Sequence, residues 1–148
     1  MKETKKKKIP ALEGLFTMPP EKPALLMSKC PSCGNVWFPR VQACRNPYCS
    51  KKQPLQDIKG GQKGKLETFT VNYYPPPPPY HAPTPFVPYA NGQIELPEGV
   101  IVSAMMPIGY TEKDLKVGMD VELVIDHLYD DDQGNEVVAW KYKPASKK

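Results

Sequence analysis

All four cysteines of this 148-residue chain fall within twenty consecutive residues and form two close pairs. Cys30 and Cys33 are separated by two residues, whereas Cys44 and Cys49 form a pair that is two residues wider. Zinc in structural sites takes four ligands in a tetrahedron, and thiolates supply them at ~2.3 Å. Gly34 follows the first pair and can adopt the positive φ that such a tight turn often needs. The spacing therefore predicts one structural zinc per chain.

Two other chemistries compete for the same cysteines. Iron in a rubredoxin-type site needs the same four sulfurs, and only metal analysis separates it from zinc. A redox pair at Cys30 and Cys33 leaves Cys44 and Cys49 unexplained. Because a four-cysteine site is closed, it offers no position to a substrate and leaves no free thiol as a nucleophile.

The remaining residue types predict no catalytic site within this chain. His81 and His127 are the only histidines, and both are expected to be ordinary loop or strand residues. Three consecutive aspartates at 130–132 read as a solvated turn more readily than as a metal cluster. The sequence has no phosphate-binding loop, dinucleotide fingerprint or nucleophile elbow. We therefore expect that the chain is not an enzyme on its own.

The elements that position these residues are predicted to be strands. Proline is excluded from helix interiors, and 19 of the 148 residues are proline. Apolar and β-branched residues gather in five segments, which predicts five strands. A capping-box-like start at Thr111 and a stop at Gly118 predict a short helix between the third and fourth strands. Asn91-Gly92 is expected to form a turn or bulge. The pattern favours a mainly β chain with a five-stranded OB-fold barrel over an SH3-like barrel. The predicted strands are 65–74, 86–96, 100–108, 121–129 and 136–142.

Charge and proline divide the chain into regions. Residues 1–28 are predicted to be an N-terminal arm with a basic tail, and residues 144–148 a second basic tail. Residues 29–53 form the zinc ribbon and carry five basic residues and no acidic one. Residues 54–143 form the barrel, with seven lysines against thirteen acidic residues. Eight of the fourteen residues from 75 to 88 are proline, which predicts an extended polyproline II loop inserted in the barrel.

Hydropathy and charge also bear on the cellular location of the protein and on whether it binds nucleic acid. No apolar run of about 18 residues occurs, so no membrane-spanning helix is expected. The basic start is not followed by an apolar segment, which favours a cytoplasmic protein over a secreted one. Zinc ribbons and OB-folds also occur in nucleic-acid-binding proteins, and this is the alternative function. The acidic barrel argues against it, because a groove that follows phosphates needs positive charge.

Several motifs together resemble a known two-module family. They are the ribbon at 30–49 with Trp37-Phe-Pro-Arg40 inside it, the runs at 64–70 and 85–87, the segment at 94–99 that ends in Pro-Glu-Gly, and the run at 114–121. The chain resembles, over residues 25–143, an acyl-CoA-associated family once called a domain of unknown function. Its members join a rubredoxin-like zinc ribbon to an OB-fold. The wide second cysteine pair and the proline loop depart from the family pattern.

The resemblance implies a non-catalytic subunit in a hetero-oligomer with a thiolase-fold catalytic chain, which cleaves a β-oxoacyl-CoA with free CoA. It implies that CoA or acyl-CoA is a ligand of the complex and that the nucleophilic cysteine lies on the partner. Basic side chains of the ribbon are then candidates to pair with CoA phosphates, namely Arg40, Arg45, Lys51 and Lys52. The proline loop and its aromatic residues are candidates for the partner interface, and a free SH3 or WW ligand or a plain stiff loop are the alternatives. The predicted interface residues are Tyr74, Pro75, Pro76, Pro77, Pro78, Pro79, Tyr80 and Phe86.

Overall fold

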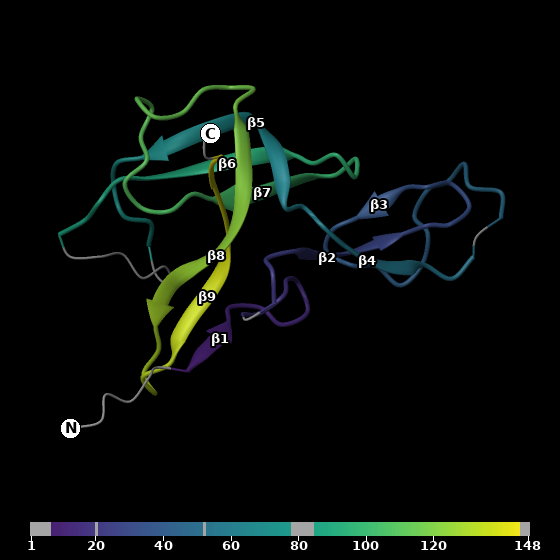
Figure 1. Cartoon of the computed structure of the whole chain (residues 1–148), viewed down its shortest axis with the longest axis horizontal. Helices are drawn as coiled ribbons and strands as arrows, with labels where there is room; N and C mark the ends of the chain where they lie inside the picture. Colours follow the sequence, from purple (N-terminus) through teal and green to yellow (C-terminus); the bar gives the residue numbers. More distant parts are fainter. Residues whose placement is uncertain (1–6, 20, 52, 78–84, 146–148) are drawn as a thin grey trace.

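The computed structural model describes residues 7–19, 21–51, 53–77 and 85–145. Within these residues the chain forms nine strands in two sheets and no α-helix (Figure 1). The prolines and the β-branched and aromatic residues account for this, because both disfavour helices. The strands are β1 (Lys8–Pro10), β2 (Leu25–Lys29), β3 (Val36–Trp37), β4 (Gln56–Gly60), β5 (Lys63–Asn72), β6 (Tyr89–Glu95), β7 (Ile101–Met105), β8 (Asp120–Asp130) and β9 (Glu136–Pro144).

The five predicted barrel strands are confirmed as β5 to β9. They pair in the order β9-β7-β6-β5-β8, and β8 pairs back to β9, so the sheet closes on itself. β7 and β9 share only one residue pair, Met105 with Lys141, which leaves the barrel partly open at that seam. Alternate residues of the strands point inward, as the period of two requires. The fully buried side chains inside include Leu66, Ile94, Val121, Val138 and Tyr142.

The predicted short helix after Thr111 does not form. The amide of Thr111 does donate a hydrogen bond to Oδ2 of Asp114 at 2.9 Å, as the capping pattern anticipated. The chain then turns instead of continuing, because the amide of Gly118 donates to the carbonyl of Leu66 in β5 at 2.7 Å. Residues 111–118 therefore form turns that lie along the barrel, and pairing with β5 replaces the hydrogen bonds of a helix.

The prediction of a turn or bulge at Asn91-Gly92 was also wrong. Both residues lie inside β6, where Gly92 is opposite Phe69 of β5 and Ala104 of β7. A Cβ atom at Gly92 would lie 2.6 Å from Cδ1 of Leu66, so the glycine allows close packing over the core. This is the other reason for glycine within a strand, which local sequence does not distinguish from a turn.

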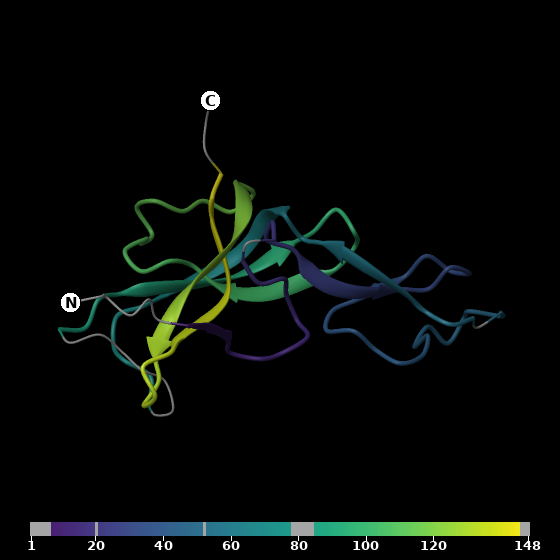
Figure 2. The same ribbon diagram turned by 60° about the horizontal axis from the view of Figure 1, so that its bottom comes forward.

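The cysteine region forms a three-stranded sheet of order β3-β2-β4, which extends away from the barrel (Figures 1 and 2). Its central strand β2 begins at Leu25 and its outer strand β4 ends at Gly60, so the sheet runs beyond residues 29–53 on both sides. The cysteines lie in the loops beyond the ends of these strands. The mainly β fold predicted from the sequence, a ribbon followed by an OB-fold barrel, is confirmed.

The segment before β2 connects the two sheets. β1 pairs in parallel with β9 and extends the barrel sheet by one short strand. Phe16 is buried and its ring lies 6.0 Å from that of Trp140 on β9. On the ribbon side Phe38 meets the same indole edge-on at 5.6 Å. Leu25 of β2 is fully buried in the same hydrophobic cluster as the barrel residues, so ribbon and barrel share one core.

Candidate metal centre and neighbouring surfaces

The structure brings the four cysteine sulfurs together at the end of the ribbon. They all lie within 4.8 Å of one another. Sγ of Cys30 is 3.9 Å from Sγ of Cys49, and Sγ of Cys33 is 3.7 Å from Sγ of Cys44. Four thiolates bound at ~2.3 Å to one tetrahedral ion would lie about 3.8 Å apart. These distances exceed a disulfide bond and fit a four-thiolate metal site.

Tight turns aim the sulfurs inward. After Cys30 the amide of Gly34 donates to the carbonyl of Cys30 at 2.8 Å, and Gly34 takes a φ of +78°. A side chain would be strained there, which explains glycine at this position. The wider second pair is also closed by a turn, in which the amide of Cys49 donates to the carbonyl of Asn46 at 3.1 Å. The two extra residues are therefore absorbed locally.

The surroundings of Cys30, Cys44 and Cys49 shift the pKa values of these thiols in different directions. The backbone amide of Cys33, which points at the sulfur of Cys30, lowers the pKa of Cys30 to about 6. Burial raises the pKa of Cys44, and burial raises the pKa of Cys49 to about 12. Four thiolates at this spacing repel one another and require a cation, so the cluster is chemically suited to a metal ion rather than to free thiols.

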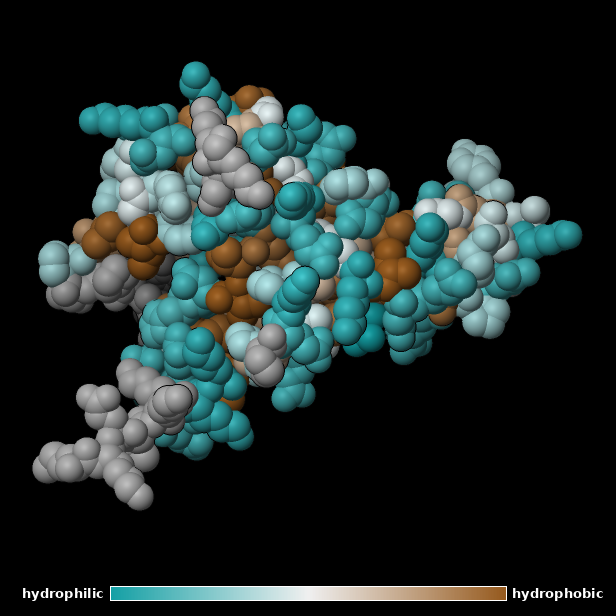
Figure 3. Space-filling model, in the orientation of Figure 1, coloured by the Kyte–Doolittle hydropathy of each residue, from teal (hydrophilic) through white to brown (hydrophobic). Residues whose placement is uncertain are grey.

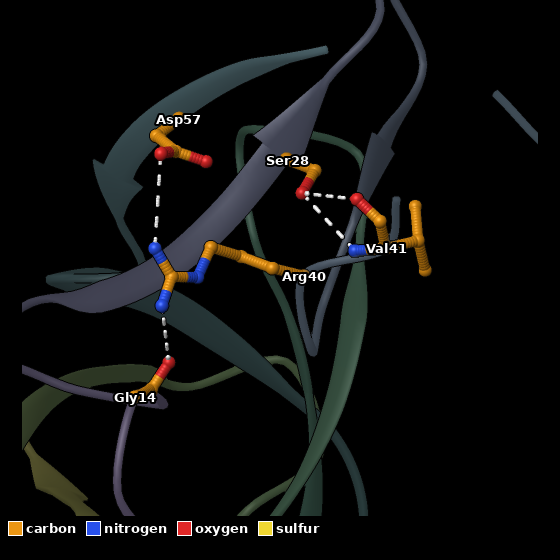
Figure 4. A network of polar contacts seen from close by, with 5 residues as sticks. All are labelled: Gly14, Ser28, Arg40, Val41 and Asp57. Atoms are coloured by element: carbon orange, nitrogen blue, oxygen red, sulfur yellow. Dashed lines mark hydrogen bonds and ion pairs between the residues drawn. The ribbon is translucent and has the colours of Figure 1, made fainter. Parts of the chain in front are cut away.

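Arg40 lies on the side of the ribbon that faces the N-terminal segment. Nη2 donates to the carbonyl of Gly14 at 3.3 Å, and Nη1 lies 3.8 Å from Oδ2 of Asp57 on β4 (Figure 4). Beside it, the hydroxyl of buried Ser28 bonds both polar groups of the Val41 backbone, at 3.1 and 3.3 Å. Arg40 therefore already joins three segments of this chain.

Of the other predicted basic residues, Lys51 lies beside the metal centre, and Arg45 directly follows Cys44 in the sequence. Arg45 and Lys51 are exposed, and Lys52 lies outside the described residues. Lys51 lines a shallow hollow of about 400 Å³ beside Cys33 and Cys49. Tyr48 borders the same hollow and is 93% exposed, although it is a large aromatic residue. Cationic and aromatic groups thus lie together at the end of the ribbon.

Of the predicted interface residues, Tyr74, Pro75, Pro76 and Pro77 follow the end of β5 in the part of the chain that the structure describes. Tyr74 is 74% exposed, and its neighbour Tyr73 contacts the carboxylate of Glu112 through its hydroxyl. That hydrogen bond raises the pKa of Tyr73. Phe86 is half-buried and packs edge-on against Tyr89 at 6.3 Å. The structure includes Pro75, Pro76 and Pro77, whereas Pro78, Pro79, Tyr80 and the histidine at position 81 lie outside the described residues.

A groove that the sequence analysis missed crosses the seam between β7 and β9. Its volume is about 670 Å³, and Met105, Phe69 and Trp140 are among the side chains that line it. Nε1 of Trp140 donates to the carbonyl of Ser103 at 3.2 Å across this seam. On the face drawn in Figure 3, hydrophobic surface gathers over the middle of the molecule and hydrophilic side chains surround it. No local pattern signals this groove, since it depends on which strands separate.

The second histidine lies among acidic side chains on the β8–β9 hairpin. Nδ1 of His127 is 3.4 Å from Oε1 of Glu136 and 4.0 Å from Oδ1 of Asp130. Nearby, the buried ammonium of Lys141 donates to the carbonyl of His127 at 2.8 Å and lies 3.3 Å from Asp126. These contacts support the irregular pairing between His127 and Tyr129. The contacts of His127 are therefore made within the β8–β9 hairpin, as expected for an ordinary strand residue.

Among the described residues, no helix is long and apolar enough to cross a membrane.

Comparison with known proteins places this architecture among recognised ones. Residues 57–126 match the family model described as ChsH2, C-terminal OB-fold domain. A DUF35 domain-containing scaffold protein of Methanocaldococcus jannaschii is 32% identical over 128 residues, which cover 84% of each chain. Another, from Methanothermobacter thermautotrophicus, is 28% identical over 130 residues and covers 84% of this chain and 90% of the relative.

A solved structure agrees on the fold. The structure titled Ltp2-ChsH2(DUF35) aldolase matches with a TM-score of 0.58 and 21% identity, over 83% of this chain and 86% of that one. At this identity the likeness supports the arrangement of ribbon and barrel. The family resemblance expected from the cysteine, Trp-Phe-Pro-Arg and Pro-Glu-Gly motifs is confirmed. With a relative 32% identical over 84% of its own length, this chain belongs to the family of DUF35 domain-containing scaffold proteins.

Proposed function

We propose that this protein is a non-catalytic accessory subunit of an acyl-CoA-processing complex, in which a thiolase-fold partner carries the catalytic cysteine. Membership of a family of scaffold proteins is the observation that carries the proposal. The structure titled Ltp2-ChsH2(DUF35) aldolase supports an association with an enzyme, since its title names a DUF35 protein together with an aldolase. The four cysteines of this chain lie close enough to share one metal ion, so a catalytic thiol has to come from elsewhere.

The metal in this proposal is structural zinc. Cys30, Cys33, Cys44 and Cys49 would hold it, and their spacing supports one ion per chain. The ion supplies folding free energy to a ribbon whose strands β2, β3 and β4 are short. Metal analysis of the purified protein identifies the ion and separates zinc from iron.

The proposed partner interface is the exposed aromatic and proline surface at the end of β5. Four exposed residues lie close together in the chain there, namely Tyr73, Tyr74, Pro75 and Pro77. A proline segment that is already extended loses little conformational entropy when it binds a partner. Deletion of residues 75–79 or the substitution Tyr74→Ala is expected to reduce co-purification with a co-expressed thiolase chain. Tyr48→Ala is the matched control, because Tyr48 is a tyrosine that is also exposed, at 93% against 74% for Tyr74, but lies at the end of the ribbon. Unchanged recovery of the partner with both Tyr74→Ala and the deletion would contradict this interface.

Arg45 and Lys51 are the proposed contacts for CoA phosphates among the described residues. Arg40 is a weaker candidate, because Gly14 and Asp57 already occupy its guanidinium group. We expect Arg45→Ala to weaken the binding of CoA to the assembled complex in calorimetry. If Arg45 contacts the 3′-phosphate, the same substitution should weaken the binding of dephospho-CoA less than it weakens the binding of CoA. Lys113→Ala, which removes an exposed lysine of the barrel, provides the control. Equal affinities for CoA in the wild-type, Arg45→Ala and Lys113→Ala complexes would rule out Arg45 as a contact for CoA.

The first reaction to test is the cleavage of benzoylsuccinyl-CoA by free CoA into benzoyl-CoA and succinyl-CoA, the thiolase step of anaerobic toluene degradation. Among the members of the family, the small subunit of that thiolase is the one that we propose the chain to resemble. Activity of the co-purified complex, and none of either chain alone, is the expected result. Binding of single-stranded nucleic acid that persists without residues 1–8 would instead favour the alternative function.

A further inference from the structure

The chain passes from the ribbon to the barrel through Gly61 and Gln62, the two residues between β4 and β5. Gly60 and Gly61 are both buried there. Gly61 has a φ of +75°, in the left-handed region that favours glycine. Two adjacent glycines at a junction between sheets would ordinarily form a flexible hinge, so the contacts around them decide whether the ribbon can move.

Both polar groups of the Gly61 backbone are bound by side chains of the barrel. Its amide donates to Oε1 of Glu98 at 2.6 Å, and its carbonyl accepts from the hydroxyl of Tyr142 at 2.6 Å. Glu98 lies between β6 and β7, whereas Tyr142 lies on β9. Two separate parts of the barrel therefore hold the two peptide groups that flank Gly61.

The glycines leave just enough room for these contacts. A Cβ atom at Gly60 would lie 2.3 Å from Oε1 of Glu98. One at Gly61 would lie 2.9 Å from both the hydroxyl of Tyr142 and Cδ1 of Leu25. Leu25 begins β2 of the ribbon, so the first residue of the ribbon and two barrel side chains converge on the junction.

We infer that Glu98 and Tyr142 form a latch that fixes the ribbon in one orientation on the barrel, with the Gly60-Gly61 junction as the element they hold. This assigns a role to the glutamate of the Pro-Glu-Gly motif, which sequence analysis recognised only as a family signature. The latch concerns the geometry within one chain, so it stands or falls independently of the proposed partner.

The hydrogen-bonding chemistry of the two side chains suits the latch through Oε1 of Glu98 and the hydroxyl of Tyr142, whereas Oε2 of Glu98 is buried without a hydrogen-bond partner in the part of the chain that the structure describes. Tyr142 is fully buried, and burial together with the nearby charge of Glu98 raises its pKa, so its hydroxyl remains a donor at neutral pH. A carboxylate that accepts from a backbone amide makes a stronger hydrogen bond than a neutral acceptor does. Packing of Phe38 on Trp140 also joins the modules, so the experiment has to separate the two contributions.

Nuclear magnetic resonance on the full, zinc-loaded chain tests the latch directly. Residual dipolar couplings report whether ribbon and barrel share one alignment tensor, and amide exchange reports the protection of Gly61. In the wild type we expect one tensor and a protected Gly61 amide. In Glu98→Ala we expect Gly61 to exchange roughly 10- to 100-fold faster, as loss of a hydrogen bond to a charged group implies. The tensor of the ribbon should then differ from that of the barrel.

Three further variants make the result specific. Glu98→Gln keeps an acceptor oxygen and should retain the common tensor, whereas Gly60→Ala displaces the carboxylate and should behave like Glu98→Ala. Glu95→Ala removes an exposed carboxylate of β6 and serves as the control. If Glu98→Ala fails to fold, Gly60→Ala and Glu98→Gln still decide the question. A common tensor and a protected Gly61 in every folded variant would overturn the latch and leave packing as the sole constraint.

Discussion

The shared core predicts that damage in the ribbon strand β2 destabilises the barrel as well. Leu25 is the most direct test, because it belongs to the ribbon sheet by pairing but is fully buried in the cluster that contains the barrel residues. The perturbation is Leu25→Ala. Leu12→Ala is the control, since Leu12 is 59% exposed.

The expected magnitude follows from the burial of Leu25. Leucine-to-alanine changes at fully buried sites cost roughly 3 kcal/mol, the sum of lost transfer free energy and an unfilled cavity. For a chain of this size each kcal/mol lowers the melting midpoint by about 2–4 °C, so Leu25→Ala should lower it by roughly 6–12 °C. Leu12→Ala should change it by less than about 2 °C, because an exposed side chain loses little burial.

The assay must follow a residue on a barrel strand, and Trp140 is such a residue, although its indole also contacts Phe38 of the ribbon. Trp37 and Trp140 are the only tryptophans, so a Trp37→Phe background leaves Trp140 of β9 as the fluorescent probe. Thermal unfolding of the zinc-loaded protein followed at Trp140 should shift by the full amount in Leu25→Ala. An unchanged Trp140 transition, with an altered transition only in a ribbon probe, would refute the single shared core.

Three more outcomes follow from the structure. Removal of zinc by a strong chelator should release one ion per chain and unfold the ribbon, because structural zinc contributes about 10–16 kcal/mol to the folding free energy. Cys33→Ser removes one of the four ligands and should lower the zinc content measured by plasma mass spectrometry. Hydrogen bonds from Asn135 hold the pKa of Asp131 below its ordinary value. The stabilisation that they provide is therefore present above about pH 4 and is lost as the pH falls through the lowered pKa. Asp131→Ala should destabilise the protein at pH 7 in urea unfolding, and the difference in stability from the wild type should shrink in acid. Gly92→Ala should cost about 1–3 kcal/mol in the same measurement, since its Cβ atom would overlap Leu66.

The division of roles among the basic and aromatic residues also came from the structure. Arg40, grouped by sequence with the other basic residues of the ribbon, joins Gly14 to Asp57. Arg45 and Lys51 are exposed, and Lys51 lies beside the cysteine cluster. Sequence spacing cannot separate these cases, because all of them are cations within one short loop-rich region.

The features that the sequence determined by itself are those with local causes. The cysteine pairs and Gly34 define turns within a few residues, and such turns direct sulfurs inward wherever the rest of the chain lies. Strand periodicity also predicted β5 to β9, because alternation of apolar residues follows from the pleat of the strand.

Tertiary structure decided what depends on distant partners. The capping pattern at Thr111 predicted a helix, but the amide of Gly118 found a better-placed acceptor in Leu66 of β5. Gly92 carried a turn signal and instead lies in β6 under Leu66, and Glu98 meets Gly61 only after the barrel closes. In each case a contact between residues far apart in the chain outweighed or completed a local preference, and local preferences are worth only about 1 kcal/mol per residue.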